Sequence, residues 1–201
     1  ELMDPQNPCG EGSNWRASNN AVGGTPGKIN SVYGTNPDVF PPKIFSAFAQ
    51  DPLSVIIYFD EAVDSLSAKY ASYSIDNGIT VFGIIVVDKK TVQVNLSNPL
   101  VTNVMYTITA SGMNDCIGNL TSNTSAGFAL TEKGEAGDLI INEVLFNPRT
   151  DGSDFVEIYN KSDKIINMQD WSLAKISGDT VSSIYSVSKI PLIMFPGSYL
   201  V

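Results

Sequence analysis

The sequence predicts an all-β protein assembled from β-sandwich domains. Helical periodicity is nearly absent along the chain. Short apolar runs rich in Val, Ile, Tyr, Phe and Thr recur between turn-forming residues, which is typical of strands. A hydrophobic fraction of 43% in 201 residues is enough to bury the cores that such domains need.

Three strands and one short helix are expected in the middle of the chain. Residues 54–60 (SVIIYFD) are apolar on both faces, as a central strand is, while residues 91–97 (TVQVNLS) and 105–112 (MYTITASG) alternate. Residues 65–71 (SLSAKYA) form the helical candidate, because an Asp or Ser caps one or two turns there. The alternation assigns these side chains to buried faces: Val92, Val94, Leu96, Tyr106, Ile108 and Ala110.

The charge pattern excludes binding to nucleic acid. The net charge is -9, only 16% of the residues are charged, and Lys89 and Lys90 form the only adjacent basic pair. Such a chain has no basic patch with which to neutralise phosphates. No apolar run approaches the roughly 18 residues that span a bilayer, so no membrane span is expected. Glu1 begins neither a basic nor an apolar stretch, and we expect that any signal peptide has been removed.

The chain contains two cysteines and no histidine. A zinc site or a cysteine-histidine nucleophile is therefore excluded in its usual form. Cys9 and Cys116 each lie in a turn-like stretch, where an exposed thiol is a liability in an oxidising compartment. Two interpretations stay open, a long-range disulfide that stabilises the fold by roughly 4 kcal/mol and two separate thiols.

Stretches rich in Pro and Gly divide the chain into an opening segment, a middle domain and a closing segment. Residues 34–42 (GTNPDVFPP) prevent continuous strand pairing because Pro removes a ladder donor. Residues 131–138 (TEKGEAGD) form a polar hinge that contains glycine.

The middle domain contains, in order, PPKIFSAFAQ, VIIYFDEAVD, LSNPLVTNVMYTIT and MNDCIGNLTS. Together these stretches resemble the Ig-like domains of bacterial surface proteins, first described in S-layer proteins of the SbsA type. VIIYFDEAVD resembles the Phe-Ser-Glu-Pro-Val-Asp stretch of that family, with Ala62 in place of the usual proline. MNDCIGNLTS resembles its Asp-x-x-Gly-Asn turn. The resemblance covers residues 41–131 and implies an Ig-like β-sandwich.

The closing segment contains LIINEVLFNP, SDFVEIYNKSDKIINMQDWSLAK and SKIPLIMFPGSYLV. These stretches resemble the beginning of a lamin-tail domain, which is itself an Ig-like sandwich. The opening segment has an Asn-Trp-x-x-Ser stretch and a Gly-Gly-Thr-Pro-Gly turn, and it resembles the end of such a domain. The resemblance therefore implies a partial lamin-tail sandwich on each side of the middle domain.

The expected organisation follows from these resemblances. Residues 1–33 are the end of a lamin-tail domain, 34–40 a linker, 41–131 the Ig-like domain, 132–138 a linker, and 139–201 the beginning of another lamin-tail domain. Partial sandwiches leave unpaired strand edges, which pair readily with another chain. We therefore expect strand complementation, in which residues 1–33 dock on residues 139–201 of the same or a neighbouring copy.

Asp115 and Asn119 are candidate calcium ligands, because acidic and amide oxygens spaced along a turn suit a hard cation. The preferred alternative is that they only shape the turn. In that case the Asx side chains accept hydrogen bonds from the backbone two residues on, and Gly118 supplies a positive φ.

Asp151 and Asp154 form a second candidate cation site, near Glu143 and Glu157. Their spacing does not match an EF-hand loop, so a solvated acidic hairpin loop is the preferred interpretation. Glu143 and Glu157 also suggest a general acid and base pair. No nucleophile with a base and no substrate-binding aromatic residues accompany them. The sequence therefore favours a non-catalytic protein without a cofactor.

Trp15 and Trp171 each lie in a stretch that resembles a lamin-tail domain. A tryptophan there serves either as a platform for stacking a sugar or as a buried anchor of the sandwich core, and the anchor is preferred. In the strand expected at 155–159, the face that carries Val156 and Ile158 is assigned to the core.

Two function classes follow from these expectations. The first is a non-catalytic module of a bacterial protein that is extracellular, on the cell surface or in the periplasm, and that acts as a spacer or as an adhesive face for an unidentified protein or glycan ligand. The second is an accessory region of a secreted nuclease or phosphatase whose catalytic domain lies outside this chain. Sandwich folds alone do not decide between these classes.

Overall fold

The computed structural model describes residues 1–7, 10–147, 149–169 and 171–201. Its elements are almost all strands in antiparallel sheets, which confirms the predicted all-β class. The chain divides into two compact units. The first consists of Glu1–Ala47, Leu53–Pro99 and Tyr106–Phe128, and the second of Phe48–Pro52, Leu100–Met105 and Ala129–Val201.

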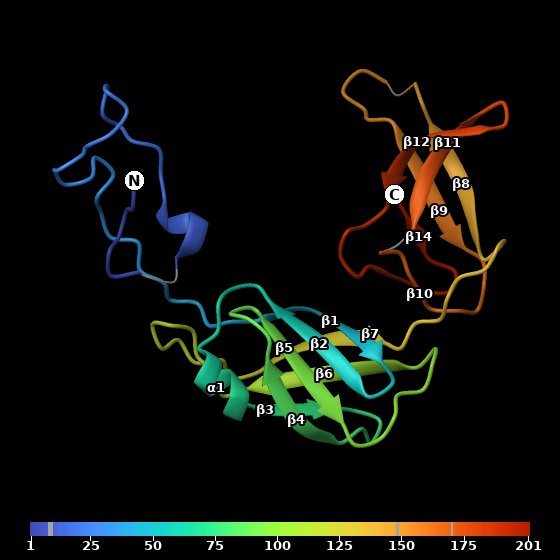
Figure 1. Cartoon of the computed structure of the whole chain (residues 1–201), viewed down its shortest axis with the longest axis horizontal. Helices are drawn as coiled ribbons and strands as arrows, with labels where there is room; N and C mark the ends of the chain where they lie inside the picture. Colours follow the sequence, from blue (N-terminus) through green and yellow to red (C-terminus); the bar gives the residue numbers. More distant parts are fainter. Residues whose placement is uncertain (8–9, 148, 170) are drawn as a thin grey trace. The chain divides into compact units, whose positions relative to one another are not determined.

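Two sheets make up the middle domain (Figure 1). One sheet has the strand order β1-β2-β5-β4, formed by Ile44–Asp51, Ser54–Phe59, Thr91–Leu96 and Val81–Val86. The other has the order β3-β6-β7, formed by Ser72–Ile75, Met105–Ser111 and Thr124–Ala129. The three strands expected from the sequence are β2, β5 and β6, and each lies between two neighbours in its sheet.

The core of this sandwich follows the alternation in the sequence. All six side chains assigned to the buried faces of β5 and β6 are at most 3% exposed. Tyr106 stacks on Phe128 of β7, with ring centroids 5.6 Å apart. The predicted helix is α1 (Ser65–Tyr70), and it begins where the Asp64 carboxylate accepts a hydrogen bond from the Ser67 N–H (2.8 Å).

The opening segment is organised around one buried amide rather than around an apolar core. Asn14 is 1% exposed and ends a short 3₁₀ helix, η1 (Glu11–Asn14). Its Nδ2 donates to the carbonyl oxygens of Asp4 (2.6 Å) and Asn7 (2.8 Å), and its Oδ1 accepts from the Asp4 N–H (2.9 Å). These bonds close the segment into a compact loop.

The second unit contains a three-stranded sheet and two strand pairs. The sheet has the order β14-β9-β8, formed by Tyr199–Leu200, Phe155–Asn160 and Leu139–Leu145. The pairs are β10 (Ile166–Asn167) with β13 (Ile193–Met194), and β11 (Ser172–Ser177) with β12 (Thr180–Ser186). The core of this unit is a buried cluster of Ile158, Ile166, Met168 and Met194.

Strand β8 exposes several of its apolar side chains. Its sequence, LIINEVL, is rich in aliphatic residues, yet Ile141 is 59% exposed and Val144 is 52% exposed. It lies at the edge of its sheet, and no strand pairs with its outer side in the part of the chain that the structure describes. The strand therefore presents both apolar side chains and an open hydrogen-bonding edge to solvent.

Candidate functional site

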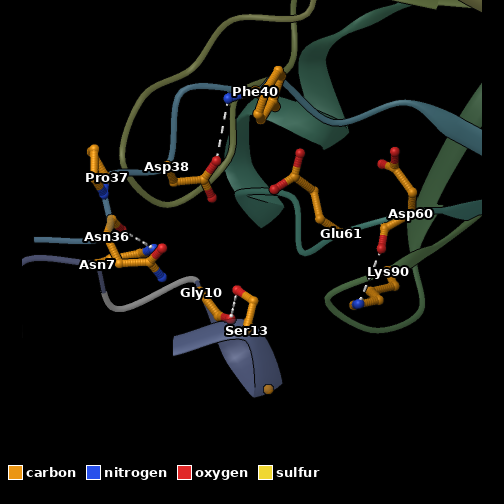
Figure 2. A pocket seen from close by; sticks show the side chains of 11 residues that line it. Asn7, Gly10, Ser13, Asn36, Pro37, Asp38, Phe40, Asp60, Glu61 and Lys90 are labelled. Atoms are coloured by element: carbon orange, nitrogen blue, oxygen red, sulfur yellow. Dashed lines mark hydrogen bonds between the residues drawn. The ribbon is translucent and has the colours of Figure 1, made fainter. Parts of the chain in front are cut away.

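A pocket of about 420 Å³ lies in the first unit (Figure 2). Four residues of the opening segment and four of the linker form part of its wall: Asn7, Gly10, Gly12, Ser13, Asn36, Pro37, Asp38 and Phe40. Asp60 and Glu61, which follow β2, and Lys90, which precedes β5, complete it. The Lys90 ammonium donates to the carbonyl oxygen of Asp60 (3.2 Å).

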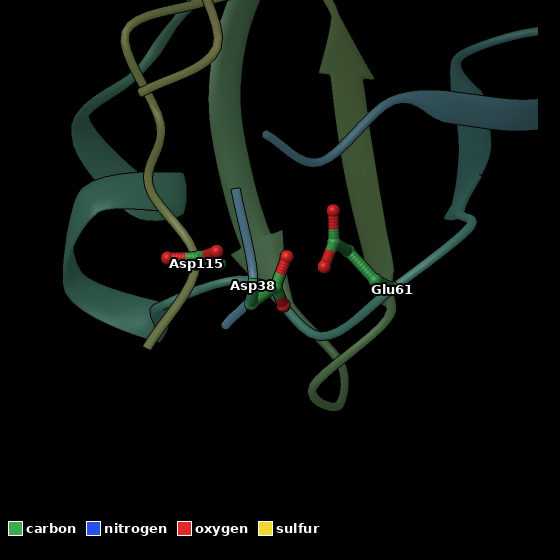
Figure 3. A group of neighbouring side chains, drawn as sticks. All are labelled: Asp38, Glu61 and Asp115. Carbon is green, nitrogen blue, oxygen red and sulfur yellow. The ribbon is translucent and has the colours of Figure 1, made fainter. Parts of the chain in front are cut away.

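Three carboxylates meet at this place (Figure 3). Asp38, Glu61 and Asp115 each offer an oxygen, and these oxygens lie within 4.8 Å of one another. Asp115 is 2% exposed, and the other two side chains are half-buried. The linker, the loop after β2 and the turn after β6 each contribute one of the three.

The turn of Asp115 forms because of its own sequence. The Oδ1 atom of Asp115 accepts hydrogen bonds from the backbone N–H groups of Ile117 (2.9 Å), Gly118 (2.7 Å) and Asn119 (2.9 Å). Gly118 has a φ of 105°, a conformation that glycine adopts without a steric penalty. The turn therefore has the Asx geometry that the sequence predicts for it.

Asn119 joins this turn to the linker. Its Nδ2 donates both to Asp115 Oδ2 (2.7 Å) and to the carbonyl oxygen of Asp38 (3.2 Å). The Asp38 carboxylate in turn accepts from the Phe40 N–H (3.2 Å). These bonds fix the linker beside the turn and bring Asp38 close to Asp115.

Crowding of negative charge contributes to the pKa of Glu61. Burial raises the pKa of Glu61 to about 7, and the charges of Asp38, Asp60 and Asp115 act in the same direction against the opposing effect of Lys90. Burial also acts to raise the pKa of Asp115, but hydrogen bonds from Asn119, Gly118 and Ile117 outweigh it and lower that pKa. Asp115 therefore stays ionised at neutral pH. Glu61 is the carboxyl group of the cluster whose pKa is raised.

The donor set decides what this site can do chemically. Its ligating atoms are carboxylate oxygens, which suit a hard cation such as Ca²⁺. The chain contains no histidine to act as a base beside them. The arrangement is therefore a candidate cation site.

The second candidate cation site is dispersed in the structure. Asp151 and Asp154 are exposed, and within the described residues they belong to no group of three or more potential ligands. Glu143 and Glu157 are directly opposite each other in the register of β8 and β9. Glu157 accepts a hydrogen bond from Asn142 Nδ2 (2.6 Å), as a residue of a solvated sheet surface does.

The predicted disulfide falls partly outside the described residues. Cys116 is exposed and disulfide-bonded. Cys9 lies outside the described residues, so the pairing of Cys9 with Cys116 stays a prediction.

The predicted core anchors divide into confirmed and corrected residues. Ile158 is 7% exposed and belongs to the core cluster of the second unit, and Trp171 packs against that cluster. Val156 is only half-buried. Trp15 is 58% exposed, so its assignment as a buried anchor was wrong. The neighbouring residue Asn14 is buried instead. Its amide forms hydrogen bonds with the backbone of Asp4 and Asn7.

Sequence reasoning found Asp115 and Asn119 but missed Asp38, Glu61 and Asn7 as residues of the same site. Asp38 lies in the Pro-rich linker and Glu61 in the stretch VIIYFDEAVD, and both were interpreted only as parts of the fold. The signal was an acidic residue in the segment that leads into β1 and another in the loop that follows β2. Such residues meet at one end of a sandwich.

Part of the chain is similar to a known domain family. Residues 132–201 match the Lamin Tail Domain. The expected lamin-tail segment at 139–201 lies within this match. The N–H of Glu132, at its start, donates to the carbonyl oxygen of Ile165 (2.8 Å), so the first residues of the matched lamin-tail segment contact its core region.

Solved structures show weaker similarity to the chain as a whole. The N-terminal part of the bacterial S-layer protein SbsC is 17% identical with a TM-score of 0.43, over 79% of this chain and 45% of that one. Domains 1-6 of the surface layer protein SbsC are 18% identical with a TM-score of 0.42, over 78% of this chain and 26% of that one. The chain thus spans less than half of the proteins it matches. No curated protein matches it.

Among the described residues, no helix has the length and apolar character needed to cross a membrane. A protein or glycan ligand and the docking of residues 1–33 on residues 139–201 stay predictions.

Proposed function

We propose that the chain is a non-catalytic β-sandwich module of a bacterial cell-surface or secreted protein, and that it acts as a structural spacer. One observation carries the spacer role. The Pro-rich stretch at 34–42, which is the linker and the two prolines after it, is hydrogen-bonded at three points, which suits a segment that transmits a fixed geometry rather than a flexible tether.

Hydrogen bonds at three points of this stretch support this proposal. Asp4 Oδ2 accepts from the Asn36 N–H (2.8 Å). Asn119 Nδ2 reaches the carbonyl oxygen of Asp38, and Thr121 Oγ1 donates to the carbonyl oxygen of Pro42 (2.7 Å). Each bond joins the stretch to a residue of the first unit.

Limited proteolysis with elastase, which cleaves after small aliphatic residues, tests the spacer role. Val39 is 62% exposed, so the Val39–Phe40 bond is available to the protease unless the backbone around it is held. We expect slow cleavage in the native chain and several-fold faster cleavage in Asn119→Ala. Asn98→Ala is the matched control, because its side chain bonds Thr80 and Gly78 instead of the linker. Equal and rapid cleavage of all three proteins would contradict the proposal.

Assays for hydrolysis of DNA and of a phosphate monoester test the non-catalytic part. We expect no turnover by the purified chain above that of a heat-denatured sample. Turnover that is lost in Glu61→Gln would overturn this part of the proposal and leave the result of the proteolysis unaffected.

A further inference from the structure

We propose that Asp38, Glu61 and Asp115 bind one Ca²⁺ ion at the junction of the linker and the middle domain. The residues come from three segments that are distant in sequence, and none of the comparisons assigns a metal to them.

The distances fit the ion. Calcium binds oxygen ligands at about 2.3–2.6 Å, so two oxygens on one ion are separated by at most about 5 Å. The three carboxylate oxygens lie within 4.8 Å of one another, and a single ion can therefore contact all of them. Their loops supply ligands of irregular geometry, which Ca²⁺ accepts and Mg²⁺ does not.

A second observation, independent of the carboxylates, points to a ligand in the same pocket. Asn7 is 4% exposed, and its Oδ1 is buried without a hydrogen-bond partner among the described residues. The amide orientation is fixed, because Nδ2 donates to the carbonyl oxygen of Asn36 (2.8 Å). Asn7 lines the pocket that Asp38 and Glu61 also line, and its amide is directed into that pocket (Figure 2).

An unpaired buried carbonyl oxygen costs roughly 1–3 kcal/mol. A hydrated cation in the pocket removes this cost, because a water molecule of its hydration shell can donate to Asn7 Oδ1. The same cation also reduces the repulsion among the carboxylates. In the pocket wall, Lys90 is the basic residue that already opposes this repulsion. One hydrated cation thus satisfies both the orphaned oxygen and the acidic cluster.

Binding at this site has a structural consequence. Asp38 belongs to the linker, whereas Glu61 and Asp115 belong to the middle domain. An ion that all three bind holds the linker on the domain, in addition to the hydrogen bond from Asn119. Calcium is therefore expected to stabilise the linker of the first unit more than the rest of the chain.

Calorimetric titration of the full chain with CaCl₂, under non-reducing conditions, tests the proposal. Extracellular calcium modules bind with dissociation constants of about 0.1–1 mM, so the titration extends to about 10 mM. We expect one ion per chain, a rise in melting temperature with Ca²⁺, and a smaller rise with Mg²⁺ at the same concentration.

Charge-removing variants locate the ion. Glu61→Gln and Asp38→Asn are each expected to weaken binding by about tenfold or more, since calcium affinity depends on the number of charged ligands. Asp154→Asn removes the same charge from an exposed loop and is expected to bind as the native chain does. Asn7→Ala is expected to weaken binding several-fold through the loss of the water-mediated contact.

The outcomes are decisive in both directions. Glu61→Gln removes repulsion, so it is expected to melt no lower than the native chain in EDTA, and loss of binding in this variant then reports on the ion and not on misfolding. Absence of heat up to about 10 mM, unchanged affinity in Glu61→Gln, or loss of affinity in Asp154→Asn would each overturn the proposal.

Discussion

The indole of Trp171 leaves no room for a side chain at Gly134. A Cβ atom on Gly134 would lie 2.5 Å from Cζ2 of Trp171 and 3.3 Å from Cδ1 of Ile166. Gly134 lies within the hinge at 131–138, near the start of the matched segment at 132–201, and it is directly against residues of the core of the second unit. A glycine in a stretch that reads as a flexible hinge is required here by packing.

Gly134→Ala is expected to destabilise the second unit by about 1–3 kcal/mol, because an added methyl group must displace the indole. Thermal unfolding followed by tryptophan fluorescence measures the change. Gly12→Ala is the control, since nothing lies within 4 Å of a Cβ at Gly12 and its φ is not positive. Equal melting temperatures for Gly134→Ala and the native chain would show that Trp171 moves aside freely.

Asp115→Ala removes the acceptor for three backbone N–H groups and is expected to lower the free energy of unfolding by about 1–3 kcal/mol. Asp115→Asn keeps an Oδ1 acceptor and is expected to lose less. Urea unfolding in EDTA compares the two variants without a contribution from any cation. If both variants lost the same free energy, the charge of Asp115 rather than the turn would be responsible.

Asn160 is fully buried and joins three parts of the lamin-tail segment. Its Nδ2 donates to the carbonyl oxygens of Lys164 (2.8 Å) and Met194 (3.3 Å), and its Oδ1 accepts from Ser162. Asn160→Ala is expected to cost about 2 kcal/mol or more, because these buried groups lose their partners. Asn142→Ala, on the exposed strand β8, serves as the control in chemical denaturation and is expected to cost far less.

Asp138 gives the second unit a stability that depends on pH. The N–H of Glu135 and the ammonium of Lys164 (2.9 Å) hold the pKa of Asp138 below its ordinary value. A carboxyl group with a lowered folded-state pKa is protonated first in the unfolded chain, so its contribution is present above about pH 4 and is lost as the pH falls through the folded-state pKa. Unfolding midpoints between about pH 5 and about pH 2 should therefore fall less steeply in Asp138→Asn than in the native chain. Parallel curves would argue against this contribution.

The sequence predicted those parts of the structure that depend on local patterns. Alternation placed Val92, Val94 and Ile108 correctly in the core because a strand has a side-chain period of two. The turn at Asp115 was predictable because its hydrogen bonds span only four residues. Both results follow from interactions between near neighbours in the chain.

The acidic cluster was not predictable in the same way. Asp38 and Asp115 come together only when the linker and the turn after β6 meet at one end of the sandwich, and no local pattern encodes that meeting. The predicted burial of Trp15 was wrong for a related reason. A tryptophan is usually buried, but in the opening segment the polar network of Asn14 takes the interior, and the indole is left outside.

The exposed edge of β8 has a practical consequence for handling the protein. A strand that shows Ile141 and Val144 to water, with unpaired N–H and C=O groups along one side, is a template on which further molecules can stack. Samples should therefore form oligomers as they are concentrated. A lysine in place of Ile141, which puts charge on that rim, should keep them monodisperse.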